Sequence, residues 1–166
     1  MISHRKEGAD VQNTAAGTTQ TRKAVIFIGL QGSGKTRFYQ THFAGAYVHI
    51  NLDELHTRNK EREAIRSCFD GGRDFVVDNT DPSAADRKRY IDAAKERGYR
   101  VIGYFFESKI RDCIRRNAQR EGKARVPVQA IAATSNKLEI PSYAEGFDEL
   151  YYVPFGEEAT EWRENE

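Results

Sequence analysis

The sequence predicts an α/β fold in which a parallel five-stranded sheet is covered by helices on both faces. Three observations predict it. Short, continuous apolar runs recur along the chain, as is typical of strands buried on both faces. The stretches between these runs carry helical spacing with start and stop signals, and strands that alternate with helices indicate a parallel sheet. A glycine-rich loop joins the first apolar run to the first helical stretch.

The expected strands follow the apolar runs in order. Ala24–Ile28 is unbroken, and Phe75–Val77 and Val101–Phe106 have the same character. Tyr47–Ile50 is similar, and Tyr151–Val153 is the weakest of the five. Runs of this length, bounded by polar and glycine-containing segments, are typical of strands in a buried sheet.

Helical stretches fill the intervals between these strands. The clearest begins at Pro82-Ser83 and ends before Gly98, which are start and stop signals for a helix. Another places Ile110 and Ile114 on one face. The sequence therefore predicts helices over about 35–43, 55–69, 83–97, 108–120 and 128–138.

Length and charge indicate one folded domain between two polar tails. The chain has 166 residues, with 26 Lys and Arg against 25 Asp and Glu, a formal net charge of +1. This balance excludes a globally basic nucleic-acid coat protein. Residues 1–22 contain few large apolar side chains and are expected to be a disordered tail. Residues 23–155 form the expected domain, and 156–166 are a second, acidic tail whose apolar anchor is Trp162.

No feature of the sequence predicts export, a membrane span or a structural metal site. No apolar run approaches the roughly 18 residues that a membrane-spanning helix needs. Cys68 and Cys113 have no Cys or His neighbour at metal-binding spacing, so two buried thiols in a reducing compartment are expected. We therefore expect a cytoplasmic protein.

The glycine-rich loop carries the strongest chemical signal in the chain. Residues 29–36 read Gly-Leu-Gln-Gly-Ser-Gly-Lys-Thr, which fits the phosphate-binding pattern G-x-x-x-x-G-K-[ST] in full. Backbone N–H groups of such a loop and the following helix N-terminus attract phosphate oxygens. The expected nucleotide ligands are Gly29, Gln31, Gly32, Ser33, Gly34, Lys35 and Thr36.

A Mg²⁺ site is predicted beside this loop. The hydroxyl of Thr36 is expected to ligate the ion, and Asp78, which directly follows the strand 75–77, supplies a carboxylate. Alternatively, Asp78 only ends the strand and starts a turn. Residue 79 is Asn rather than the second carboxylate that motor ATPases use to activate water, so hydrolysis is not the expected main activity.

Asp53 follows the second expected strand and is the candidate general base. The carboxyl ends of strands in a doubly wound sheet face the ligand crevice, so this carboxylate is expected beside the phosphate loop. There it can accept the proton of an attacking hydroxyl. Alternatively, Asp53 is the N-cap of the helix that passes through Leu55.

A basic segment predicts a mobile lid at about 116–127. Arg116 and Arg120 lie one helical turn apart, Gly122 frees the chain, and Pro127 restarts a helix. Arginine is suited to stabilise charge on a transferring phosphoryl group. A solvated helix face is the simpler interpretation for Lys109 and Arg111.

Taken together, these motifs resemble those of the P-loop polynucleotide 5′-hydroxyl kinases over about residues 24–155. The resemblance rests on the phosphate loop, on Asn51-Leu52-Asp53 after the second strand, and on later motifs in combination. These later motifs are Asp78-Asn79-Thr80-Asp81-Pro82 with Arg87 and Tyr90, Arg116-Asn117 with Arg120, Val126-Pro127, Pro141 and Ala144-Glu145-Gly146-Phe147.

The resemblance implies ATP- and Mg²⁺-dependent phosphorylation of a DNA or RNA 5′-hydroxyl. It also implies a nucleoside monophosphate kinase-like strand order, with Asp53 as base, Arg120 as the lid arginine and Arg116 as a nucleotide ligand. Leu52 stands where relatives often carry arginine, and His56 stands where a phage member of the family has an arginine that holds the acceptor's phosphate. His56 either contacts the acceptor or is a plain surface histidine. Two alternatives to a polynucleotide kinase stay open. One is a kinase of a small metabolite, nucleoside or sugar, and the other is a non-catalytic ATP-binding module.

Overall fold

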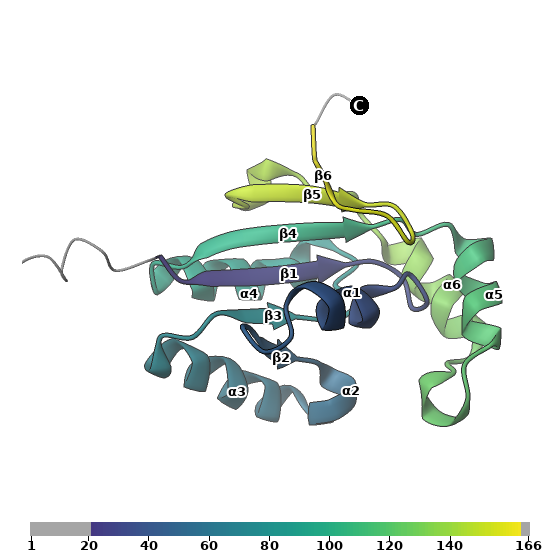
Figure 1. Ribbon diagram of the computed structural model, residues 1–166, viewed down its shortest axis with the longest axis horizontal. Coiled ribbons are helices and arrows are strands. Elements are labelled where there is room, and N and C mark those ends of the chain that lie inside the picture. Colours follow the sequence, from purple (N-terminus) through teal and green to yellow (C-terminus); the bar gives the residue numbers. More distant parts are fainter. Residues whose placement is uncertain (1–20, 164–166) are drawn as a thin grey trace, which may run out of the picture.

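The computed structural model describes residues 21–163 and shows one sheet with helices on both faces (Figure 1). The strand order is β2-β3-β1-β4-β5-β6. All strand pairs are parallel except β5 and β6. The strands are β1 (Lys23–Ile28), β2 (Val48–Ile50), β3 (Phe75–Val77), β4 (Arg100–Phe106), β5 (Glu149–Val153) and β6 (Thr160–Glu161). The predicted α/β class and parallel sheet are therefore confirmed, while the tail predicted for 1–22 lies almost wholly outside the described residues.

The helices lie in the intervals that the sequence predicts, with one division. They are α1 (Lys35–His42), α2 (Leu52–Leu55), α3 (Arg58–Gly71), α4 (Ala84–Glu96), α5 (Ile110–Ala118) and α6 (Val128–Lys137), with short 3-10 turns η2 (Gly122–Ala124) and η3 (Tyr143–Glu145). The stretch expected as one helix is split into α2 and α3. His56 has a left-handed φ of 71°, and the Thr57 side chain caps α3 by accepting from the Lys60 amide.

The sheet has one more strand than the five predicted. β6 pairs antiparallel with β5, and the Trp162 amide donates to the Leu150 carbonyl at 2.9 Å. The Trp162 ring packs edge-on against Phe105, with 5.8 Å between ring centroids. Part of the segment expected as an acidic tail is therefore an edge of the sheet, anchored by the tryptophan that the sequence singles out. A two-residue strand is too short for its side-chain alternation to show in the sequence.

Two apolar clusters hold the helices on opposite faces of the sheet. Val25 and Phe27 point to the cluster that contains Tyr39 and Phe43, so α1 lies on that face. Ala24, Ile26 and Ile28 point to the other cluster, which α3 and α4 cover with residues that include Ile65, Cys68, Ile91 and Ala94. β1 is thus buried on both faces, and the carboxyl ends of β1, β2 and β3 meet at one edge. This is the edge where an open α/β sheet binds its ligand.

The described residues also answer two questions from the sequence, on membrane-spanning helices and on the two cysteines. In residues 21–163, no helix is long and apolar enough to cross a bilayer. Cys68 and Cys113 are both buried and not joined by a disulfide.

Candidate active site at the carboxyl edge of the sheet

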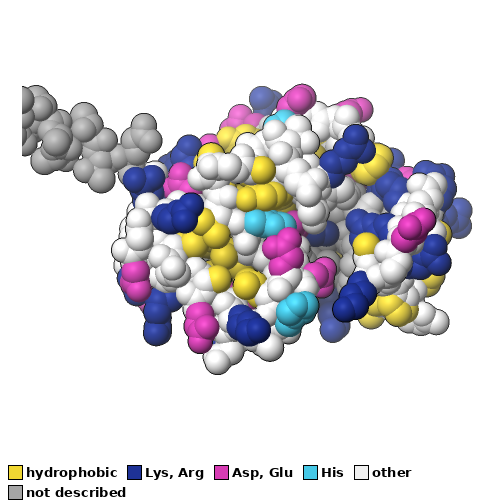
Figure 2. All heavy atoms as spheres, turned by 60° about the horizontal axis from the view of Figure 1, so that its bottom comes forward, with side chains coloured by type: hydrophobic (Ala, Val, Ile, Leu, Met, Phe, Trp, Pro, Cys, Tyr) yellow, Lys and Arg dark blue, Asp and Glu magenta, His cyan; other side chains and the backbone are white. Residues whose placement is uncertain are grey.

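A cleft of about 260 Å³ opens at the carboxyl edge of the sheet. Figure 2 shows the molecule hollowed between its main body and a projecting part on which Lys and Arg side chains gather. The cleft brings together the phosphate loop, α2, the turn after β3 and the segment between α5 and α6. Its lining includes Gln31, Gly32, Lys35, Thr36, Asn51, Asp53, Asp78, Asn79, Arg120 and Lys123.

The phosphate loop adopts backbone conformations that favour glycine. Gly32 and Gly34 have φ values of 82° and 93°, which L side chains rarely adopt. At Gly32 there is also no room for a side chain, because an added Cβ would lie 2.6 Å from the carbonyl oxygen of Cys113. The loop curls between β1 and α1, as the sequence predicts, and its close contact with α5 requires glycine.

Lys35 is buried inside the loop rather than extended into solvent. Its Nζ donates hydrogen bonds to the carbonyls of Gly29 at 3.0 Å and Leu30 at 2.7 Å. Burial lowers the pKa of Lys35 to about 8, although the charge of Asp78 opposes the shift. The ammonium is thus held at the floor of the cleft, where an anionic ligand would stabilise its charged form.

Thr36 and Asp78 meet as the sequence predicts. The Thr36 hydroxyl donates to Oδ2 of Asp78 at 2.8 Å, and the Asp78 side chain is 1% exposed. Hydroxyl and carboxylate oxygens are the donors that Mg²⁺ prefers, so the pair fits this ion with phosphate oxygens and water completing its shell. The described residues contain no group of three or more His, Cys, Asp or Glu side chains that could hold a metal ion.

His49 is a contact of Asp78 that the sequence does not reveal. Its Nε2 lies 2.8 Å from Oδ2 of Asp78, and its ring stacks on Tyr39 with 4.1 Å between centroids. Burial alone would lower the pKa of His49, but the hydrogen bond and charge of Asp78, with a smaller effect of Glu54, raise it. The histidine therefore fixes the orientation of the carboxylate from the neighbouring strand.

Asp53 lies exposed on α2 and lines the cleft. The interpretation of Asp53 as an N-cap is wrong, because Asn51 occupies the cap and its side chain accepts from the Asp53 amide at 2.8 Å. The carboxylate of Asp53 is left available to a ligand. His56 lies at the other end of α2, exposed and outside the lining of the cleft.

The two arginines of the basic segment lie in different places. Arg120 lines the cleft, within a loop that Asn117 closes through its hydrogen bonds to the amide and carbonyl of Val126 at 3.0 and 2.7 Å. Arg116 instead donates to the Gly32 carbonyl at 2.6 Å, and its guanidinium lies 3.7 Å from the centroid of the Phe155 ring. Phe155, which sequence reasoning did not select, also lines a second hollow of about 490 Å³ beside Ser33 and Gly34.

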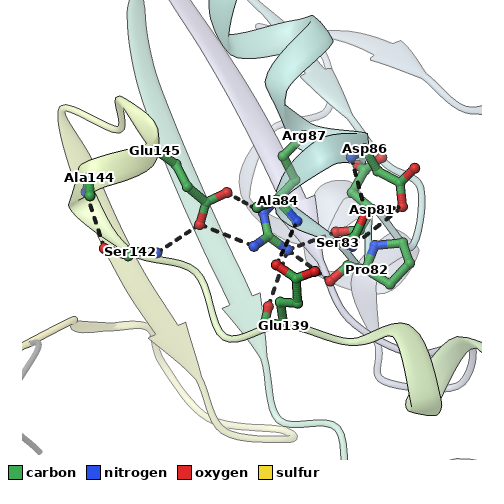
Figure 3. Close-up of polar contacts among 10 residues, drawn as sticks. All are labelled: Asp81, Pro82, Ser83, Ala84, Asp86, Arg87, Glu139, Ser142, Ala144 and Glu145. Carbon is green, nitrogen blue, oxygen red and sulfur yellow. Dashed lines mark hydrogen bonds and ion pairs between the residues drawn. The ribbon is translucent and has the colours of Figure 1, made fainter.

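Arg87 and Glu145, two residues of the motifs described above, point toward each other and form an ion pair between α4 and η3 (Figure 3). Arg87 is fully buried and donates to both carboxylate oxygens of Glu145, at 2.7 and 3.1 Å. Its Nη1 also donates to the carbonyls of Asp81, Pro82 and Glu139, at 3.0–3.2 Å. The pair therefore ties the turn after β3 to the segment before β5.

Comparison with known proteins agrees with this geometry. Residues 25–141 match the family described as AAA domain (AAA_33). A protein of Acanthamoeba polyphaga mimivirus, assigned as a bifunctional polynucleotide phosphatase/kinase, is 28% identical over 141 residues, which cover 81% of this chain and 34% of the relative. The bifunctional polynucleotide phosphatase/kinase of Schizosaccharomyces pombe is 26% identical over 82% of this chain and 35% of its own length. The chain thus spans about a third of these relatives.

A sugar kinase from Janibacter sp. HTCC2649 has a similar fold. Its TM-score is 0.60 at 16% identity, over 82% of this chain and 87% of that protein. This likeness concerns the fold alone. From the extent of the family match, with the phosphate loop in its place between β1 and α1, the chain belongs to the AAA_33 family of P-loop domains and has the fold of P-loop kinases.

Proposed function

We propose that this protein is an ATP-dependent kinase that transfers the γ-phosphate to a hydroxyl group, and that its acceptor is the 5′-hydroxyl of DNA or RNA. One observation carries the proposal: the Asp53 carboxylate lines the same cleft as Lys35, Thr36 and Arg120. A base, a phosphate-binding loop and an arginine on one cleft are the parts that phosphoryl transfer to an alcohol uses.

The proposed reaction uses each of these groups once. Asp53 accepts the proton of the acceptor hydroxyl as its oxygen attacks the γ-phosphorus, and the bond to the β-phosphate oxygen breaks to release ADP. Lys35 and Arg120 stabilise the charge on the transferring phosphoryl group. Thr36 and Asp78 would hold Mg²⁺, which would neutralise phosphate charge. Arg116 and Phe155, which lie beside the second hollow, would contact the adenine end of ATP.

The two polynucleotide phosphatase/kinase relatives support a nucleic-acid acceptor. A small hydroxyl-bearing acceptor is the second candidate, and two observations favour it: the fold is shared with a sugar kinase, and position 52 is Leu, which cannot hold a chain phosphate. His56 is exposed at the end of α2, outside the lining of the cleft, so it would contact an acceptor phosphate only if the acceptor extends beyond the cleft.

A phosphate-transfer assay separates these candidates. The protein is incubated with γ-labelled ATP, Mg²⁺ and a panel of 5′-hydroxyl DNA and RNA oligonucleotides, nucleosides and sugars. Label on an oligonucleotide is the expected result. Label only on a small molecule would move the protein to the second candidate, and tight ATP binding without transfer to any acceptor would contradict the kinase proposal.

Asp53→Asn is expected to lower kcat by about 10²- to 10⁴-fold, because an amide cannot accept the hydroxyl proton. The Kd for ATP should stay within about twofold, since Asp53 lies on the acceptor side of the cleft. Parallel measurements of kcat and of ATP affinity check this prediction. Asp92→Asn, the same change on the exposed face of α4, is the control. Turnover at the wild-type rate in Asp53→Asn would remove Asp53 from the mechanism.

Affinity for ATP is expected to fall as the pH rises above about 8. The buried Lys35 has a pKa of about 8 in the free protein and loses its charge above that value. The phosphates of ATP favour the charged form of Lys35. Above about pH 8, ATP binding is therefore coupled to uptake of a proton, and the Kd for ATP is expected to rise by up to about tenfold per pH unit. Titrations between pH 7 and 9.5 measure this dependence. The exposed-lysine variant Lys109→Ala should keep the same profile, whereas a constant Kd would contradict the assignment.

A further inference from the structure

Asn79 connects the turn after β3 to the helix that carries the proposed base. Its Oδ1 accepts a hydrogen bond from the Leu52 amide at 3.0 Å. Its Nδ2 donates to Oε2 of Glu61 at 2.9 Å. Its neighbour Asp78 contacts Thr36 at the start of α1. Two successive residues therefore contact two different elements of the cleft, Asp78 the end of the phosphate loop and Asn79 the helix α2.

The helix α2 depends on such contacts for its position. It is a single turn of four residues, none of which is buried, although Leu55 packs partly against the core. Its first two amides are bound by the side chains of Asn79 and Asn51. Because a helix this short is not stable by itself, these side-chain acceptors determine where Asp53 is placed.

Glu61 determines which end of the Asn79 amide faces α2. Glu61 is 2% exposed, and its carboxylate also accepts from the Tyr90 hydroxyl at 2.9 Å and from Nη1 of Arg58 at 3.1 Å. A carboxylate offers only acceptors, so the NH₂ group of Asn79 must face it and the carbonyl oxygen must face Leu52. The buried glutamate thus selects the one orientation of Asn79 that holds the helix.

We propose that Asn79, oriented by the buried Glu61, is a positioning residue that holds α2 so that Asp53 meets the acceptor hydroxyl. This inference rests on the proposed function. It gives the amide at position 79 a role on the acceptor side of the cleft, in place of the water-activating role of a carboxylate.

Exchanging donor and acceptor across the pair tests this arrangement. In Glu61→Gln, the new amide keeps its oxygen on Tyr90 and Arg58 and presents its NH₂ to Asn79. Asn79 must then turn and oppose the Leu52 amide with a donor. In Asn79→Asp, two carboxylates face each other. In the double variant, the carboxylate introduced at position 79 accepts from both the side-chain amide introduced at position 61 and the Leu52 amide, so every contact is satisfied again.

Two measurements report the outcome. Each single variant is expected to lower kcat for the acceptor by about tenfold to a hundredfold, with an unchanged KM for ATP, because misplacement of a catalytic group by about an ångström has this effect. Each is also expected to speed hydrogen exchange of the Leu52 amide, followed by NMR, by about tenfold or more. The double variant should restore both. Glu63→Gln, an exposed change on the same helix as Glu61, should alter neither.

The inference is overturned if the single variants keep wild-type kcat and wild-type Leu52 exchange, or if the double variant is no better than the worse single variant. A wild-type protein that phosphorylates no acceptor would refute the proposed function instead. The exchange rate of Leu52 would then still decide whether Asn79 and Glu61 hold α2.

Discussion

Lys35→Ala is expected to lower kcat/KM by at least about a thousandfold. The one ammonium that it removes both binds the phosphates of ATP and stabilises the transferring phosphoryl group. Unlike Asp53→Asn, it should weaken ATP binding as well as transfer. The two variants together would therefore separate nucleotide binding from acceptor activation. Steady-state kinetics and calorimetric titration with ATP measure the two effects.

The stability of the free Lys35→Ala protein distinguishes this loss from unfolding. Burial lowers the pKa of Lys35 to about 8, so below that pH the charged lysine destabilises the unliganded fold. This destabilisation disappears as the pH rises from about 8 toward the pKa of lysine in the unfolded chain. Removing the lysine should leave Tm unchanged or slightly raised at neutral pH, despite the loss of its hydrogen bonds to the loop carbonyls. Lys109→Ala is the control for charge. An active Lys35→Ala protein would contradict the assignment of the loop as the phosphate site.

Arg87→Met is expected to lower the free energy of unfolding by about 3–5 kcal/mol, the largest stability effect that we predict. The substitution leaves the Glu145 carboxylate and three backbone carbonyls without their buried donor. For a chain of this size, the corresponding fall in Tm is on the order of 10 °C. Chemical denaturation and thermal melting measure it.

Arg89→Met is the matched control for Arg87→Met. Arg89 lies on the same helix, is exposed, and contacts Asp86 at 3.8 Å. A surface ion pair of this kind is worth at most about 1 kcal/mol. If Arg87→Met lowers the free energy of unfolding by less than about 1 kcal/mol, it loses no more than a surface pair contributes. That result would show that the Arg87–Glu145 pair does not hold the turn after β3.

The sequence predicts the parts of the fold that carry periodic or motif information. Apolar runs locate the five parallel strands, and the loop pattern locates the phosphate site between β1 and α1. The break at His56 is less visible, since it depends on one left-handed residue and a Thr57 cap inside a helical pattern. The antiparallel strand β6 is missed because its pairing with β5 is a tertiary contact.

The candidate site shows the same division between local and long-range information. Lys35 and Thr36 follow from the phosphate-loop pattern, and Asp53 and Asp78 follow from their places after two strands. The structure lines one cleft with all four. Contacts between elements distant in sequence are not readable in this way. Glu61 faces Asn79 across 18 positions, and Arg116 meets Phe155 from a still more distant part of the chain. Such partners become apparent only when the chain is folded.

The contact between Gly32 and α5 limits how the active site can close. Gly32 lies against the backbone of Cys113 with no space for a Cβ, and its carbonyl accepts from Arg116. The start of α5 is therefore held against the phosphate loop. For the proposed kinase, we expect a hinge for lid closure to lie beyond Asn117, in the glycine-containing segment before α6. Arg116 would then be in place before the nucleotide arrives, whereas Arg120 would move toward the phosphates as the lid closes.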